Sequence, residues 1–145
     1  YGFNITNEAT VMLASQRRNC SFSQRMKNFA WNDLNLAQWE AIDAGYDTAI
    51  LLDSNSYITE GPGFNVGFIV GDRIYTPRDN CLEGVTMKKI SKVKDVKYHD
   101  ISRGFAFDAD AMFLTSTAGQ VIRVTKFNDV EYKENELLTW LQNNI

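Results

Sequence analysis

The sequence predicts a mixed α/β (α+β) domain in which strands outnumber helices. Its 145 residues, 44% of them hydrophobic, suit one domain with a buried core over residues 1–145. Short apolar runs typical of buried strands recur along the chain, and three stretches show helical spacing instead. Internal repeats and low-complexity segments do not occur in the sequence, so these patterns indicate one chain that mixes many strands with a few helices.

The predicted strands are short apolar runs bounded by turn residues. Residues 9–16 are the first, because their apolar run gives way to a polar stretch. Asn55 and Ser56 turn the second strand toward the next segment, and Gly71 with Asp72 predicts a two-residue hairpin. In order, the predicted strand segments are residues 9–16, 48–53, 57–60, 65–70, 73–77, 96–101, 111–116 and 120–127.

Three helices are predicted from apolar residues at helical spacing. The first begins at Asn32, where Asp33 can serve the N-terminal turn, and Gly45 supplies its stop. Residues 85–93 predict a short second helix, and residues 134–144 an amphipathic third one. The inward positions are Leu34, Ala37, Ala41 and Ala44 in the first helix and Leu137, Leu138 and Leu141 in the third.

Charge and composition argue against several classes of partner. The net charge of −3 and the pI near 5.1 give no basic field for nucleic acid or anionic membranes. The sequence has no run of 18 apolar residues, and its start lacks the basic and apolar regions of a signal peptide. Cys20 and Cys81 are isolated and His99 is the only histidine, so neither a zinc site nor a disulfide framework is expected. We therefore expect a cytoplasmic protein that binds a small molecule or another protein.

Two turns rich in small residues are candidate phosphate sites. They span residues 83–86, which open a predicted helix, and residues 116–119, which end a predicted strand. Such turns can aim backbone N–H groups and hydroxyls at a phosphate, with help from the helix dipole. Taken alone, each turn is more often an ordinary cap than an anion site.

Two charged residues are candidates for chemistry at these loops. Lys27 precedes the first helix; most lysines are solvated, and one that forms a Schiff base needs burial or a nearby cation to lose its proton. Glu60 shares a face with Ile58, which places its carboxylate on the apolar side, where it needs a partner such as a cationic ring nitrogen. His99 is interpreted as a strand-surface residue. Two interpretations stay open for the arginines close to Lys27 in the sequence: they are the cations that lower the pKa of the lysine, or they are solvated surface residues. These arginines are Arg17, Arg18 and Arg25.

Read together, these segments resemble a known family of enzymes. The segments are "KNFAWNDL" (27–34), "EAIDAGYDTAILLD" (40–53), "ITEGPGFNVGFIV" (58–70), "RIYTP" (73–77), "LEGVTMKKI" (82–90) and "AMFLTSTAGQV" (111–121). In this order and spacing they are similar to the class IV (fold-type IV) pyridoxal-phosphate aminotransferases. Within that family, the segments "TEGPGFN" (59–65) and "KNFAWNDL" (27–34) are most similar to branched-chain and (R)-amine aminotransferases. The resemblance implies the large C-terminal domain of that fold, with β-sheets in a pseudo-barrel and flanking helices, and a homodimer.

The resemblance also implies a role for each matching residue. Lys27 matches the lysine that forms the Schiff base and moves the proton between the substrate Cα and cofactor C4′. Glu60 matches the carboxylate that keeps the pyridine nitrogen protonated, and Leu82 the apolar residue against the ring face. The implied phosphate-binding residues are Val85, Thr86 and Thr117, and the implied substrate-binding residues are Ser116, Thr117 and Ala118.

The sequence departs from the family pattern in three ways. Met87 stands where the family often has arginine, and Arg123 replaces a common proline; neither position is expected to do the chemistry. The family's smaller N-terminal domain, which closes the pocket and supplies an arginine to the phosphate, has no match here.

The substrates that the resemblance implies are amino acids, or less often primary amines, and 2-oxo acids. Two alternatives stay open: a lyase of the aminodeoxychorismate type, and a noncatalytic fragment of such an enzyme.

Overall fold

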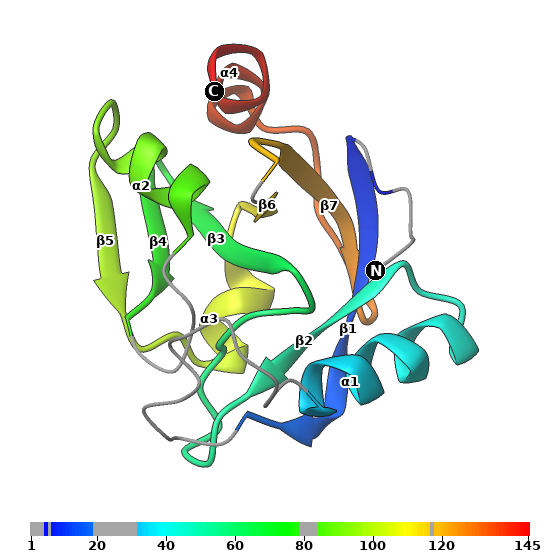
Figure 1. The fold of residues 1–145 in the computed structure, drawn as a ribbon. Coiled ribbons are helices and arrows are strands. Elements are labelled where there is room, and N and C mark those ends of the chain that lie inside the picture. The colour runs from blue at the N-terminus through cyan, green and yellow to red at the C-terminus, as the bar shows by residue number, and fades with distance from the viewer. Residues whose placement is uncertain (1–4, 6, 19–31, 79–83, 117) are drawn as a thin grey trace.

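One curled β-sheet organises the protein (Figure 1). The computed structural model describes residues 5, 7–18, 32–78, 84–116 and 118–145. The strands are β1 (Glu8–Arg17), β2 (Thr48–Leu52), β3 (Phe64–Val70), β4 (Arg73–Pro77), β5 (Val96–His99), β6 (Ala111–Ser116), β7 (Val121–Phe127) and β8 (Val130–Glu131). The helices are α1 (Asn32–Asp43), α2 (Val85–Ser91), α3 (Arg103–Asp108) and α4 (Glu136–Asn144).

The sheet is mixed, with the order β2-β1-β7-β6-β3-β4-β5 and with β8 paired to β7. β1 is parallel to both of its neighbours, since Val11 pairs with Thr48 of β2 and Ala9 pairs with Val124 of β7. β6 is antiparallel to both of its neighbours, β3 and β7. β3 joins β4 through the tight hairpin predicted from the sequence. Gly71 occupies the left-handed region there, with φ of 64°. The mixed α/β class and the curled, open form of the implied pseudo-barrel are confirmed.

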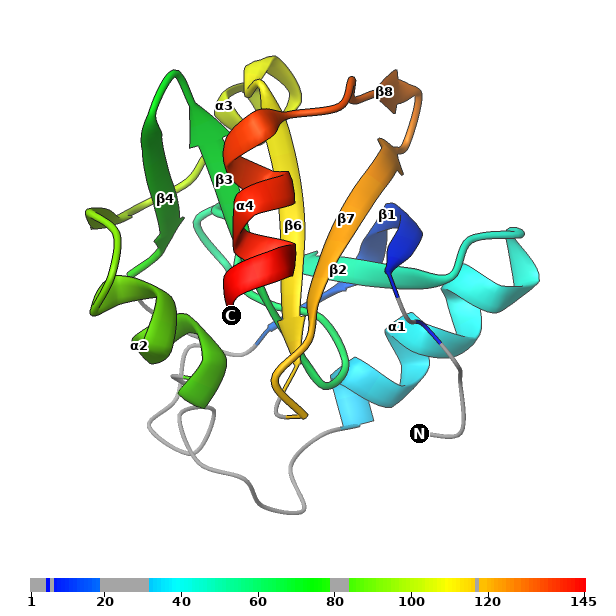
Figure 2. The ribbon, with the colours of Figure 1, turned by 90° about the horizontal axis from the view of Figure 1, so that it is seen from above.

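Helices cover both faces of this sheet, because alternate strand residues enter different cores. Met112 of β6 lies in a core with Ala106 of α3. Phe113, the next residue, lies on the other face in a core shared with α2 and α4. Both helices are labelled in Figure 2. Helix α1 covers β1 and β2 on that second face, through a core that includes Leu34 and Leu51. The predicted inward positions Leu34, Ala37, Ala41, Leu138 and Leu141 are confirmed, and Leu137 is partly buried. Ala44 is a correction: it is exposed, because α1 ends at Asp43, one residue before it.

The strand predicted at residues 57–60 is wrong. That segment makes only isolated bridges, from Ile58 to Leu52 and from Tyr57 to Ser102. Ile58, Thr59 and Glu60 are all buried, whereas a half-buried strand would alternate. The segment is buried because it lies against β2 on one side, through Leu51, and donates the Ile58 N–H to Ile101 on the other.

Two elements were not predicted from the sequence, α3 and β8. Helix α3 has six residues, too few for helical spacing to be recognised, and it is held by the Ser102 cap, whose hydroxyl accepts from Phe105 N. Strand β8 has two residues. His99 is exposed at the end of β5, as interpreted from the sequence, and its ring contacts Tyr75.

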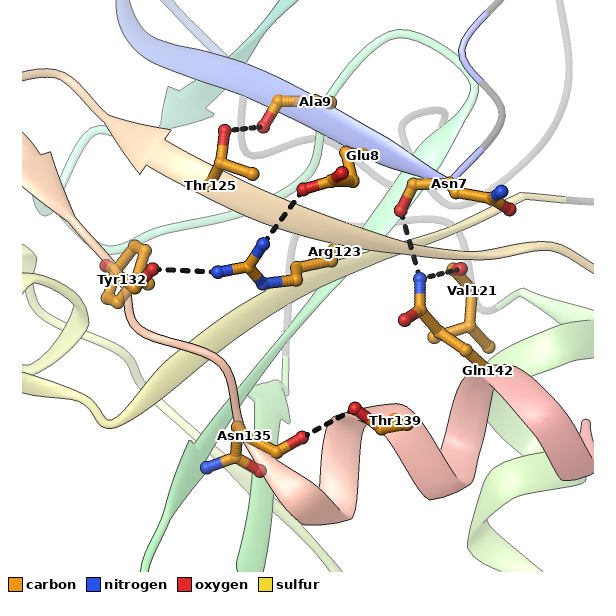
Figure 3. A network of polar contacts seen from close by, with 10 residues as sticks. All are labelled: Asn7, Glu8, Ala9, Val121, Arg123, Thr125, Tyr132, Asn135, Thr139 and Gln142. Carbon is orange, nitrogen blue, oxygen red and sulfur yellow. Dashed lines mark hydrogen bonds and ion pairs between the residues drawn. The ribbon is translucent and has the colours of Figure 1, made fainter.

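Arg123 has a structural position at the junction of β1, β7 and β8 (Figure 3). Its guanidinium lies 2.8 Å from Glu8 Oε2 and donates to the Tyr132 carbonyl at 3.0 Å. Gln142 of α4 binds the same region by donating to the Asn7 and Val121 carbonyls. The arginine that replaces a common proline of the family therefore joins β7 to β1 and to the chain that follows β8.

Tyr132 anchors α3 to the chain that follows β8. Its buried hydroxyl donates to the Ala106 carbonyl at 2.6 Å. Burial raises the pKa of this hydroxyl above its usual range, and the nearby Asp108 carboxylate adds to the effect. The folded protein thus holds the Tyr132 proton more tightly than the unfolded chain does.

We expect this raised pKa to make the fold sensitive to alkali. Stability from Tyr132 is fully present below the unfolded pKa of 10.0 and is lost as the pH rises above it, because the unfolded chain ionises first. At pH 8, Tyr132→Phe should lower the free energy of unfolding by roughly 0.5–1.5 kcal/mol. Urea unfolding should show this gap shrinking above pH 10.0, since the other five of the six tyrosines are common to both proteins. Parallel curves would contradict the prediction.

Candidate functional site

Three segments distant in sequence meet where β6 ends. Thr86, in the first turn of α2, donates its hydroxyl to the Ser116 carbonyl at 2.5 Å. Phe64 and Asn65, which begin β3, pair with Ser116 and Thr115 of β6. The segment 59–65, the start of α2 and the turn after β6 therefore lie side by side. Thr86 and Ser116, one from each of the two turns that the sequence predicts as phosphate sites, are therefore in contact.

Helix α2 begins at Val85, directly after Gly84, whose own backbone is extended, with φ of −84° and ψ of 146°. A Cβ on Gly84 would lie 2.0 Å from Asn65 Oδ1, so a larger residue here would force the Asn65 side chain to move. Gly84 offers no side-chain cap, and the first N–H groups of a helix have no intrahelical partner. Backbone donors and the Thr86 hydroxyl are thus the polar groups of this helix start.

Glu60 is held in place by backbone hydrogen bonds to β2. Leu51 N donates to the Glu60 carbonyl at 3.1 Å, and Thr59 donates to the Leu51 carbonyl through its N–H and its hydroxyl. The next residue must be glycine, because a Cβ on Gly61 would lie 2.4 Å from the Ala49 carbonyl oxygen. Gly63 completes the turn with φ of 80°. This close packing fixes the backbone from which the Glu60 side chain projects.

The Glu60 carboxylate is buried beside an arginine. Glu60 is 4% exposed, and its Oε2 lies 3.5 Å from Arg18 Nη2. Arg18 is 1% exposed and binds Asp33 through Nη1, at 2.7 and 2.9 Å to the two carboxylate oxygens. The side chains come from three places: the residue after β1, the first turn of α1, and the segment after β2. The expected burial of Glu60 is confirmed.

The other predicted site residues have different outcomes. Lys27, Leu82 and Thr117 lie outside the described residues. Thr86 is buried, Ser116 is partly buried, and Val85 and Ala118 are exposed. The roles assigned to all of these residues, and to Glu60, stay predictions.

Sequence reasoning missed two members of the site. The sequence indicates Arg18 only as one of several cations near Lys27, and Asp33 only as a residue of the N-terminal turn. Asp33 does serve that turn, since its Oδ1 accepts from Leu34 N at 2.8 Å, but it also binds Arg18. No local signal pairs residues 15 and 42 positions apart, so the structure was needed to find the cluster. Met87, where the family often has arginine, is buried in the core beneath α2.

The groups present fit pyridoxal phosphate. A buried carboxylate suits a protonated ring nitrogen, and neutral hydroxyl and N–H donors at a glycine-lined helix start suit a phosphate. Within the described ranges, His, Cys, Asp and Glu side chains form no group of three that could hold a metal ion. Helices in those ranges are also too short or too polar to cross a membrane.

Comparison with known proteins identifies the family. Residues 4–127 match the family described as amino-transferase class IV. A probable branched-chain-amino-acid aminotransferase of Aquifex aeolicus is 36% identical over 110 residues, which are 70% of this chain and 35% of that protein. The chain belongs to the class IV aminotransferase family.

Solved structures share the fold. The branched-chain aminotransferase of Thermoproteus uzoniensis, solved with norvaline, superposes with a TM-score of 0.89 at 20% identity, over 99% of this chain and 52% of that one. A putative 4-amino-4-deoxychorismate lyase from Legionella pneumophila has a TM-score of 0.86 at 22% identity, over 97% of this chain and 56% of that one. The chain thus spans about a third of the Aquifex protein and about half of each of these structures.

Proposed function

We propose that this chain is the cofactor-binding part of a pyridoxal-phosphate-dependent aminotransferase. The observation that carries the proposal is the Glu60 carboxylate, buried beside Arg18 at the loop where the family motif predicts an acid for the ring nitrogen. Membership of the class IV family supports it. Residues 1–145 are then the large domain, which a second, smaller domain completes in the whole protein.

The proposed roles follow from the chemistry of each group. When bound, the cofactor supplies an aldehyde that condenses with amines and a ring that accepts electrons. Lys27 would hold the cofactor covalently through its amine, and would then move the proton at the substrate Cα. Glu60 would accept a hydrogen bond from the protonated ring nitrogen, so that the ring keeps its electron-withdrawing charge. Leu82 would pack against the ring face.

The start of α2 would bind the phosphate. N–H groups of Val85 and Thr86 lie in the first turn, where the helix dipole favours an anion. The Thr86 hydroxyl, which donates to the Ser116 carbonyl here, would turn toward a phosphate oxygen, with Thr117 on the facing turn. Ser116, Thr117 and Ala118 would also border the substrate.

The proposed reaction moves an amino group from a branched-chain amino acid, or from a primary amine, to a 2-oxo acid. The Aquifex relative, whose name is that of a branched-chain aminotransferase, supports this choice. The second candidate is a lyase acting on aminodeoxychorismate, favoured by the fold shared with the Legionella protein. Turnover that requires a 2-oxo acid identifies the aminotransferase, and turnover without one identifies the lyase.

Cofactor binding tests the proposal directly. Adding pyridoxal phosphate to the full chain should produce an absorbance band near the visible edge, and borohydride should remove it and leave a stable label on Lys27. Peptide mapping by mass spectrometry locates the label. A label on another lysine would refute the assignment of Lys27. The absence of any band would instead favour the noncatalytic fragment.

We further propose that the whole protein is a cytoplasmic homodimer, as in the family it resembles. An outward stripe on α1, formed by Leu36, Trp39 and Ile42, is 47–68% exposed and gives an apolar surface that another chain or domain would cover. Sedimentation at several protein concentrations measures the assembly. A monomer throughout would refute the homodimer without bearing on the cofactor.

A further inference from the structure

Arg18 makes unequal contacts with two carboxylates. Its Nη1 makes short hydrogen bonds to both oxygens of Asp33, whereas its Nη2 approaches Glu60 Oε2 at 3.5 Å. The side chain of Arg18 has no exposed surface, and those of Asp33 and Glu60 are 18% and 6% exposed. Asp33 therefore fixes the plane of the guanidinium, and the second nitrogen is directed at Glu60.

The charge of Glu60 decides what it can do for a cofactor. Burial alone favours the neutral form of a carboxyl group, and a neutral carboxyl would donate a hydrogen bond to an unprotonated ring nitrogen. An adjacent cation favours the ionised form, which can only accept. Arginine is suited to this position, because its guanidinium keeps its charge when buried and its planar fork serves two acceptors.

We propose that Arg18 is a positioning residue for the reaction. It keeps the Glu60 carboxylate ionised and fixed in orientation, so that Glu60 accepts from a protonated ring nitrogen, and Asp33 orients Arg18. This inference rests on the proposed function and adds to it the group that sets the charge of the ring partner. Arg18 acts through Glu60 and is not assigned a contact with the cofactor.

Arg17 provides a matched control one residue away. Its Nη1 donates to the Asp53 carbonyl at 2.7 Å and to the Ser56 hydroxyl at 3.0 Å. It is thus an arginine of the same β1 terminus that binds a neighbouring turn. A substitution at Arg17 reports the general effect of losing an arginine here.

The experiment compares two ligands that differ at the ring nitrogen. Binding of pyridoxal phosphate and of its 1-deaza analogue, in which carbon replaces that nitrogen, is measured by absorbance on the full chain. Both carry the aldehyde and the phosphate, so the ratio of their Kd values isolates the ring nitrogen. Arg18→Met should lower the preference for pyridoxal phosphate by about tenfold or more, whereas Arg17→Met should leave it unchanged. Glu60→Gln should lower it similarly, and the double variant with Arg18→Met should add nothing further.

Circular dichroism and thermal melting check that each variant is folded. If Arg18→Met does not fold, Arg18→Met with Asp33→Leu removes both charges of the tight pair and should give the same fall. A folded variant with an unchanged ratio, or one that weakens both ligands equally, would overturn the role of Arg18 alone. Failure of the unaltered protein to bind either ligand would overturn the proposed function, and this inference with it.

Discussion

Lys27→Ala should abolish the borohydride-stable label and slow amino-group transfer by at least about 10²–10⁴-fold, the usual contribution of a general acid–base residue alone. The variant loses the amine that would hold the cofactor and the group that would move the proton at the substrate Cα. The measurement is keto-acid-dependent turnover in the full chain, followed with saturating pyridoxal phosphate. Added methylamine should restore part of the rate, because it supplies an amine without restoring the side chain.

Lys133→Ala is the matched control for this prediction. Lys133 is exposed after β8, away from the loops at the end of β6, so its loss should leave turnover unchanged. Equal losses in the two variants would point to a general effect of charge. A fully active Lys27→Ala protein would refute the assignment of the lysine, and the class IV motif would then need another nucleophile.

Gly61→Ala should lower the free energy of unfolding by about 1–3 kcal/mol, the usual cost of inserting a methyl group into close packing. The new Cβ would lie 2.4 Å from the Ala49 carbonyl oxygen, a backbone atom of β2 that cannot rotate away. The segment that carries Glu60 would have to move off β2. Urea unfolding measures the loss, and pyridoxal phosphate should bind more weakly in the same variant.

Gly104→Ala offers a control with the opposite sign. Gly104 lies in α3, and a Cβ there would meet no atom within 4 Å. Alanine is a better helix former than glycine, so this variant should be stabilised by roughly 0.5–1 kcal/mol. A similar loss of stability in both variants would contradict the explanation based on contact with Ala49.

Local patterns predicted the strands and the longer helices well, because burial on one face leaves a period in the sequence. Helix α4 shows such a period, whereas residues 111–116 were predicted as a short continuous apolar run, which is typical of a strand buried on both faces. Helix α3 could not be predicted in this way, because Phe105 is held by rings of other elements, Phe68 and Tyr75. The stability of α3 therefore depends on contacts with other elements rather than on the helical spacing of its own residues.

The site was predicted only in part for a similar reason. The sequence predicts a buried Glu60 because in a strand it would share the apolar face of Ile58; its burial is confirmed, but that reason is wrong, since the whole segment is enclosed. Arg18 and Asp33 were visible as charged residues without an assigned partner. Ion pairs between distant residues depend on the path of the chain between them, which periodicity does not report.

The parallel pairing of β1 has a consequence for how the chain folds. β1 hydrogen-bonds to β7, so residues 8–11 must find residues 123–127 before the sheet is complete. Loops of this length are entropically costly to close, and contacts between distant residues slow folding. On the ribosome, β1 would emerge more than a hundred residues before its partner. Until β7 has been synthesised, the unpaired edge and the apolar residues of β1 would be exposed and prone to aggregate. The risk of aggregation therefore ends only when the C-terminal strands pair with β1.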